Sequence, residues 1–345
     1  MINLTLYGYV LFYQIIIVTR EIKGVNMEKN YALFKKYLPI LIVVTVIGLI
    51  FSLFTLAYDS YDPATITVDF GGVIPIFWIA FLVISYAVAF MFAFQVKNLH
   101  IKRIKKNSSF SKFAALLAAG LITALFLFNF IQFVKLERSL STAKIVRLIF
   151  SIPFIAYLIV GIIPKEFHRK RIEIPKWIAP VSAIGAIAWC ISSLFAIYFW
   201  TGASALPTTN FFRLTHMFYL ALATLFFLSE IGFEMLGKGH KLYVLTATCL
   251  FVTTTVITGT IMVANFLGQA KEISISGFEI FVGVALGVYA LSRLFAIQYT
   301  LKYVMKQQKD GTGRHHHHHH HHSGSKPKVT STGKSKSAIP EDIDI

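Results

Sequence analysis

Residues 211–236 read FFRLTHMFYLALATLFFLSEIGFEML, an apolar run that is long enough to cross a bilayer yet carries ionisable side chains. At about 100° per residue, its polar residues fall within roughly one third of the helix circumference. These residues are Arg213, His216, Tyr219, Glu230 and Glu234. Because charges inside a membrane are costly, they usually face protein or water and often mark function. The run therefore predicts a membrane-spanning helix with a polar seam along one face, which is a candidate pathway.

Similar apolar runs recur along the whole chain. Of the 345 residues, 56% are hydrophobic and 14% are charged, whereas about a quarter of a soluble domain is charged. The runs are continuously apolar, while the strands of a membrane barrel would alternate. The sequence predicts an all-α, polytopic integral membrane bundle of about eight transmembrane helices. The predicted spans are 37–58, 73–96, 113–134, 145–163, 177–200, 211–236, 242–264 and 278–300.

The distribution of Lys and Arg predicts the orientation in the membrane. Loop 97–112 carries six of these residues, loop 164–176 five and loop 237–241 two. On the opposite side, loops 59–72 and 201–210 carry none, loop 265–277 has Lys271 alone, and loop 135–147 is an exception with four. Cytoplasmic loops are enriched in Lys and Arg, so both ends of the eight-helix unit are predicted to be cytoplasmic.

Much of the net charge of +17 lies in these loops and in the C-terminal tail, so it does not indicate a nucleic-acid partner. Cys190 and Cys249 both fall inside predicted spans, which leaves no disulfide framework and no cysteine-based metal site. The chain contains no P-loop, no Gly-x-Ser-x-Gly and no His-Glu-x-x-His motif. No catalytic residue and no cofactor is predicted.

Three segments are predicted: a doubtful N-terminal extension (1–26), the transmembrane domain (27–307) and a polar disordered tail (308–345). Lys-Gly-Val before Asn26 can be encoded by AAA-GGA-GTN, which contains the bacterial ribosome-binding string AAGGAG. Met27 is therefore the expected start, with residues 1–26 a mistranslated leader; an extra span is the alternative.

The tail contains eight consecutive histidines, His315–His322, between Gly-rich and Ser-rich flanks. A histidine tract can bind metal, but a homopolymer in this setting is more typical of an engineered expression tag. No native metal site is predicted.

The last span supplies expected partners for the charges on the seam. Glu230 and Glu234 lie near the cytoplasmic face, and Arg293 lies at a comparable depth, so Arg293 is predicted to pair with one of them. Glu279 lies at the outer level and is the expected partner of Arg213 and His216. Fourteen residues, or about 21 Å, separate His216 from Glu230, so the seam is expected to form two layers.

The string from Arg213-Leu-Thr-His216 through Glu230, with the following Gly-Lys-Gly-His turn and another apolar span, resembles a pattern in uncharacterised multi-span membrane proteins of low-GC Gram-positive bacteria. The likeness covers residues 211–264. It implies a multi-pass protein of the bacterial cytoplasmic membrane and carries no activity.

Three classes of function remain open. The first and favoured one is a non-enzymatic sensor, accessory or assembly protein, acting on a membrane-protein partner or as a homo-oligomer. The second is a transporter of a small ion or metabolite that uses the polar seam of the last three spans. The third is a membrane-embedded lipid-modifying enzyme. A closed, fully paired interior would favour the first class, and an open cavity reaching Glu230 would favour the second.

Overall fold

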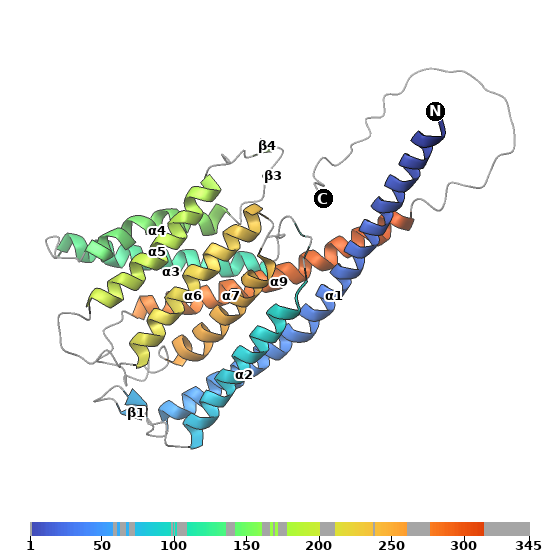
Figure 1. Ribbon diagram of the computed structural model, residues 1–345. Helices are drawn as coiled ribbons and strands as arrows, with labels where there is room; N and C mark the ends of the chain where they lie inside the picture. The colour runs from blue at the N-terminus through green and yellow to red at the C-terminus, as the bar shows by residue number, and fades with distance from the viewer. Residues whose placement is uncertain are drawn as a thin grey trace.

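The computed structural model consists almost entirely of helices (Figure 1). It describes residues 2–57, 61–62, 67–68, 73–97, 99, 101, 109–135, 142–160, 166–167, 170–171, 178–200, 211–236, 239–260 and 277–313. Side chains are described for the narrower ranges 26–55, 73–97, 99, 101, 109–131, 133–135, 142–160, 181–196, 216–233, 239–260 and 279–307.

Each predicted span coincides with a helix of the structure, although α1 and α9 extend well beyond their spans. They are α1 (Ile2–Ala57), α2 (Val73–Gln95), α3 (Ser109–Lys135), α4 (Thr142–Val160), α5 (Ile178–Trp200), α6 (Phe211–Leu236), α7 (His240–Thr253), the π-helix η1 (Thr254–Thr258) and α9 (Gly277–Gly313). Two hairpins of two-residue strands lie in the loops: β1 (Tyr61–Asp62) with β2 (Thr67–Val68), and β3 (Glu166–Phe167) with β4 (Lys170–Arg171). The all-α prediction is therefore confirmed apart from these short loop strands.

Seven helices of the described part are long and apolar enough to cross a membrane, and a shorter apolar helix covers Val181–Ala196. Large apolar side chains such as Val83, Phe94 and Ile184 are exposed on the outside of the bundle. On a soluble protein such a surface would be a liability, but lipid covers it in a membrane. The chain is a multi-pass membrane protein.

Three boundaries differ from the predictions. Helix α1 begins at Ile2, so the predicted boundary between residues 26 and 27 lies inside a helix. Helix α4 begins at Thr142, so Lys144 and Arg147 belong to a helix and not to loop 135–147. Helix α9 ends at Gly313, so the predicted tail boundary at 307 lies inside a helix. The His315–His322 run falls outside the described residues.

Neighbouring helices form a closed ring in the order α1, α2, α7, α6, α5, α4, α3 and α9, with α9 also packed against α7 and η1. The most buried helices are α7, taken together with η1, and α9. Of an 18-residue apolar stretch in each, 78% and 72% is buried inside the protein, against 28% for α2 and for α4. Figure 1 shows α7 and α9 between the α1–α2 pair and the α3–α5 group. The middle of α7 and of α9 is thus surrounded by protein, whereas their ends carry exposed residues such as Lys241 and Lys302.

Close packing at this centre depends on two glycines of α9. A Cβ at Gly287 would lie 1.8 Å from Thr254 Oγ1, and a Cβ at Gly283 would lie 2.9 Å from Thr258 Cγ2. Both threonines belong to η1, so the Gly-x-x-x-Gly face of α9 is the surface on which the π-helix rests. Small residues allow such close approach between membrane helices.

Candidate functional site: two buried charge clusters

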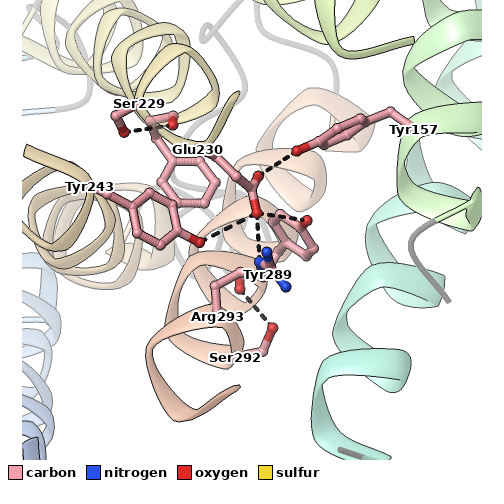
Figure 2. Close-up of polar contacts among 8 residues, drawn as sticks. Tyr157, Ser229, Glu230, Tyr243, Tyr289, Ser292 and Arg293 are labelled. Atoms are coloured by element: carbon pink, nitrogen blue, oxygen red, sulfur yellow. Dashed lines mark hydrogen bonds and ion pairs between the residues drawn. The ribbon is translucent and has the colours of Figure 1, made fainter. Parts of the chain in front are cut away.

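The inner cluster is centred on the Glu230 carboxylate of α6, whose residue is 0% exposed. Arg293 of α9 donates from Nε to Oε1 over 2.5 Å, and Tyr157 of α4 donates to Oε2 over 2.8 Å. Tyr243 of α7 and Tyr289 of α9 also donate to Oε1, at 3.3 and 3.4 Å. One carboxylate therefore accepts hydrogen bonds from four donors on three other helices (Figure 2).

The predicted pairing of Arg293 with Glu230 or Glu234 is confirmed for Glu230. The side chain of Glu234 lies outside the described residues. Burial explains the pairing, because an isolated charge in an apolar interior would cost several kcal/mol or more.

Aromatic rings pack against the tyrosines of the inner cluster. Phe226 stacks on Tyr243 with ring centroids 5.6 Å apart, and Phe227 stacks on Tyr289 at 6.3 Å. Phe233 also stacks on Tyr243, with ring centroids 5.2 Å apart. These contacts hold the tyrosine hydroxyls toward Glu230, and the low local dielectric strengthens each hydrogen bond.

Tyr157→Phe is expected to destabilise the protein by about 1–3 kcal/mol, because Tyr157 is the sole donor to Oε2 among the described residues. Tyr289→Phe is the matched control, since Oε1 keeps other donors when its long 3.4 Å contact is removed. Denaturant unfolding in detergent should show the larger loss for Tyr157→Phe. Equal losses would mean that the hydroxyl of Tyr157 does not support Glu230.

The outer cluster is centred on an ion pair between Arg147 of α4 and Glu279 of α9. His216 of α6 is 2% exposed, stacks edge-to-face on Tyr219 at 4.6 Å and lies within electrostatic range of both charges. A hydrogen bond connects α4 to α5 beside this cluster. Trp189 of α5 donates from Nε1 to the hydroxyl of Ser151, which lies one helical turn after Arg147 on α4.

Glu279 has a partner that sequence analysis did not name, and His216 lies within electrostatic range of it, as predicted. Glu279 pairs with Arg147, which sequence analysis placed in an outer loop, and the side chain of Arg213 lies outside the described residues. The burial of Arg147 at 3% exposure also accounts for part of the exception in the loop charges. Arg147 lies inside the bundle, where it neutralises Glu279. It therefore does not indicate on which side of the membrane the preceding loop lies.

The structure thus separates the predicted seam residues into two groups. Glu230 and Arg293 belong to the inner cluster, while His216, Tyr219 and Glu279 belong to the outer cluster. Sequence analysis missed Tyr157, Tyr243 and Tyr289 as ligands of Glu230 and Arg147 as the partner of Glu279. Within the ranges whose side chains are described, no three His, Cys, Asp or Glu residues gather as a metal-ligand set.

Comparison of the chain with known protein families, with curated proteins and with solved structures finds no match in any of the three. The buried clusters themselves are therefore the basis for a functional proposal.

Proposed function

We propose that the chain is a non-enzymatic sensor, accessory or assembly protein of the bacterial cytoplasmic membrane. The observation that carries this proposal is that the carboxylate of Glu230 has its hydrogen-bonding positions occupied. Glu230 is fully buried and accepts hydrogen bonds from four donors on three other helices. A carboxylate held in this way locks four helices together. It is poorly placed to load and release protons or cations during a transport cycle.

An apolar layer between the two clusters supports the same proposal. On α6, the buried residues between Tyr219 and Glu230 include Ala223, Phe226 and Phe227. On α9, Ala285 and Leu286 are likewise buried between Glu279 and Arg293. About 21 Å of helix separates His216 from Glu230. Ions and protons need polar groups or water along their path, and these five side chains of α6 and α9 offer no polar group.

The cytoplasmic-membrane assignment rests on the Lys- and Arg-rich loops and on the resemblance across residues 211–264. Figure 1 shows the start of α1 and the end of α9 extending from the same side of the bundle, and these helices contact each other. That arrangement agrees with two ends on one side of the membrane. The surroundings are a lipid bilayer, and the functional partner is another membrane protein or a second copy of the chain.

A small-ion or small-metabolite transporter is the second candidate, and η1 is the observation that favours it. Single π-helical turns within α-helices occur frequently at functional sites. Here the π-helix lies against α9 in the centre of the bundle, where Thr258 contacts the same glycine as Tyr219 of the outer cluster. A rearrangement of η1 would alter the packing beside that cluster.

A flux measurement separates the two candidates. Proteoliposomes that contain a trapped pH-sensitive dye are expected to show the same proton flux as protein-free liposomes after a pH jump, for the wild type and for Glu230→Gln. A protonophore added at the end confirms that the vesicles are sealed. A flux that is present in the wild type and lost in Glu230→Gln would contradict the accessory role and establish the transport reading.

A further inference from the structure

One end of the bundle exposes lysines that take no part in the two buried clusters. The start of α1 and the end of α9 extend from this end, and these helices contact each other (Figure 1). Helix α2 ends here as well, because Asn30 of α1 bonds to Lys97 just after α2. The exposed lysines described on these three elements form what we call the lysine rim: Lys29, Lys35, Lys36, Lys97, Lys302 and Lys306.

On α1, the lysine rim continues a lipid-facing stripe. At about 100° per residue, Lys29 and Lys36 lie within roughly 60° of Ile40 and Val43 around the helix axis. Ile40 is 40% exposed and Val43 is 56% exposed, whereas Phe34 on the opposite side is buried. Lys29 and Lys36 therefore lie directly beyond a surface that faces acyl chains, at the level expected for lipid headgroups.

After α2, the backbone of Lys97 is held in place. The backbone N–H of Lys97 donates to Oδ1 of Asn30 at 3.0 Å, and Nδ2 of Asn30 donates to the carbonyl of Lys97 at 3.3 Å. Asn30, Val96 and Leu99 are 0% exposed, which anchors the segment on both sides, while Phe94 of α2 is 67% exposed. The exposed side chain of Lys97 thus extends from a fixed position close to lipid-facing surface, so binding through it requires little ordering of the backbone.

Lys36 is directed toward the end of α2. Its Nζ atom lies 5.5 Å from the centroid of the Tyr37 ring. The hydroxyl of Tyr37 accepts a hydrogen bond from Nε2 of Gln95 at 2.8 Å, and Gln95 is the last residue of α2, two before Lys97. These contacts place the ammonium group of Lys36 and the backbone of Lys97 at the same junction between α1 and α2.

On α9, the same change from apolar to basic surface occurs. Tyr299 is 50% exposed, and Lys302 and Lys306 lie within roughly 60° of it around the helix axis. Tyrosine and lysine together are typical of the boundary between acyl chains and headgroups. Three neighbouring elements thus carry exposed lysines where their apolar surface ends.

The charge of the lysine rim is positive. Glu28 is the one acidic residue among the described side chains of the stretches 26–40, 95–97 and 299–307, and it can neutralise at most one lysine. In sequence, loop 97–112 adds further Lys and Arg and contains no acid. A free phosphate would meet only these charges, whereas an anionic phospholipid also covers the exposed apolar residues beside them.

We propose that the lysine rim binds anionic phospholipids, with headgroup phosphates held by Lys36 and Lys97 at the junction between α1 and α2. The acyl chains lie against the exposed stripes that contain Ile40 and Phe94. The proposal requires only that the bundle is embedded in a bilayer, so it does not depend on the accessory role proposed above.

A lipid competition experiment tests the binding. The purified full chain is equilibrated with mixed micelles that contain equal amounts of phosphatidylglycerol and phosphatidylcholine with the same acyl chains. After gel filtration, the retained lipids are counted by mass spectrometry. Phosphatidylglycerol is expected to be retained about five-fold over phosphatidylcholine, and high salt should reduce this ratio.

Equal retention of the two lipids would overturn the proposal, because the lysines would then serve topology alone. Soluble glycerol phosphate, added at constant ionic strength, should leave the ratio unchanged. Loss of phosphatidylglycerol to this competitor would show that the lysines bind free phosphate, and would overturn the assignment to a lipid.

Single variants assign the binding to the junction. Lys36→Gln and Lys97→Gln are each expected to lower the retention ratio at least about two-fold, while Lys36→Arg should keep it. Lys135→Gln is the matched control, since it removes one exposed lysine at the opposite end of the bundle, where α3 ends. Exposed substitutions of this kind should leave folding intact. An equal loss in Lys135→Gln, or an unchanged ratio in both Lys36→Gln and Lys97→Gln, would overturn the proposal.

Discussion

Arg293→Ala is expected to lower the free energy of unfolding by about 3–5 kcal/mol, because it leaves the Glu230 carboxylate buried without its counter-charge. Glu230 is 0% exposed and Arg293 is 1% exposed, so water cannot replace the lost partner. The three tyrosines still donate, but neutral hydroxyls do not compensate a full charge. Reversible unfolding in mixed micelles, followed by circular dichroism, measures the loss.

The double variant Glu230→Gln with Arg293→Met tests whether the charge itself is responsible. A buried ion pair replaced by neutral residues of similar volume is often tolerated, so the double variant should recover most of the stability lost by Arg293→Ala. Lys302→Ala, an exposed change on the same helix, should stay within about 0.5 kcal/mol of the wild type. A double variant as unstable as Arg293→Ala would show that packing, and not charge, explains the loss.

The spans and the Glu230–Arg293 pair could be predicted because both follow from the energetics of a single chain in lipid. Continuous hydrophobicity over the length of a bilayer located α6 at residues 211–236, which are its observed bounds. The cost of an unpaired charge then required Arg293 to lie near an acidic residue of similar depth. Neither argument needs to know which helices are neighbours.

The remaining members of the clusters depend on which helices are neighbours, and periodicity does not encode that. Tyr157 reaches Glu230 only because the bundle places α4, which packs between α3 and α5, with its Tyr157 side chain toward α6. In the sequence alone, a tyrosine near a helix end is equally typical of a membrane interface. Arg147 was assigned to a loop because basic residues beside a span usually are loop residues. Only the position of Glu279 in the assembled bundle shows why Arg147 lies inside the protein.

The π-helix was also beyond prediction, because Thr254–Thr258 has the same apolar character as the α-helical residues before it. Thr254 donates to the carbonyl of Leu250 at 2.7 Å and lies 3.2 Å from that of Phe251, as β-branched threonines do in ordinary helices. Gly283 and Gly287 of α9 form the face that contacts η1.

Gly287→Ala is expected to destabilise the bundle by about 1–3 kcal/mol, the usual cost of overpacking a tight interior. The new Cβ would lie 1.8 Å from Thr254 Oγ1 and 2.8 Å from Thr254 Cβ. Rotation of the threonine side chain relieves the first contact, but the second requires α9 and η1 to move apart. The same micelle unfolding experiment measures the effect.

Gly120→Ala is the matched control, because its Cβ would meet nothing within 4 Å. Replacing glycine within a helix by alanine favours the helix by roughly 0.5–1 kcal/mol, so this variant should be as stable as the wild type or more so. Thr254→Ala combined with Gly287→Ala removes the hydroxyl contact and keeps the Cβ contact, so it should recover only part of the loss. If Gly287→Ala were stabilising like Gly120→Ala, α9 and η1 would not be packed as closely as their backbones indicate, and the central position of the π-helix against α9 would have to be abandoned.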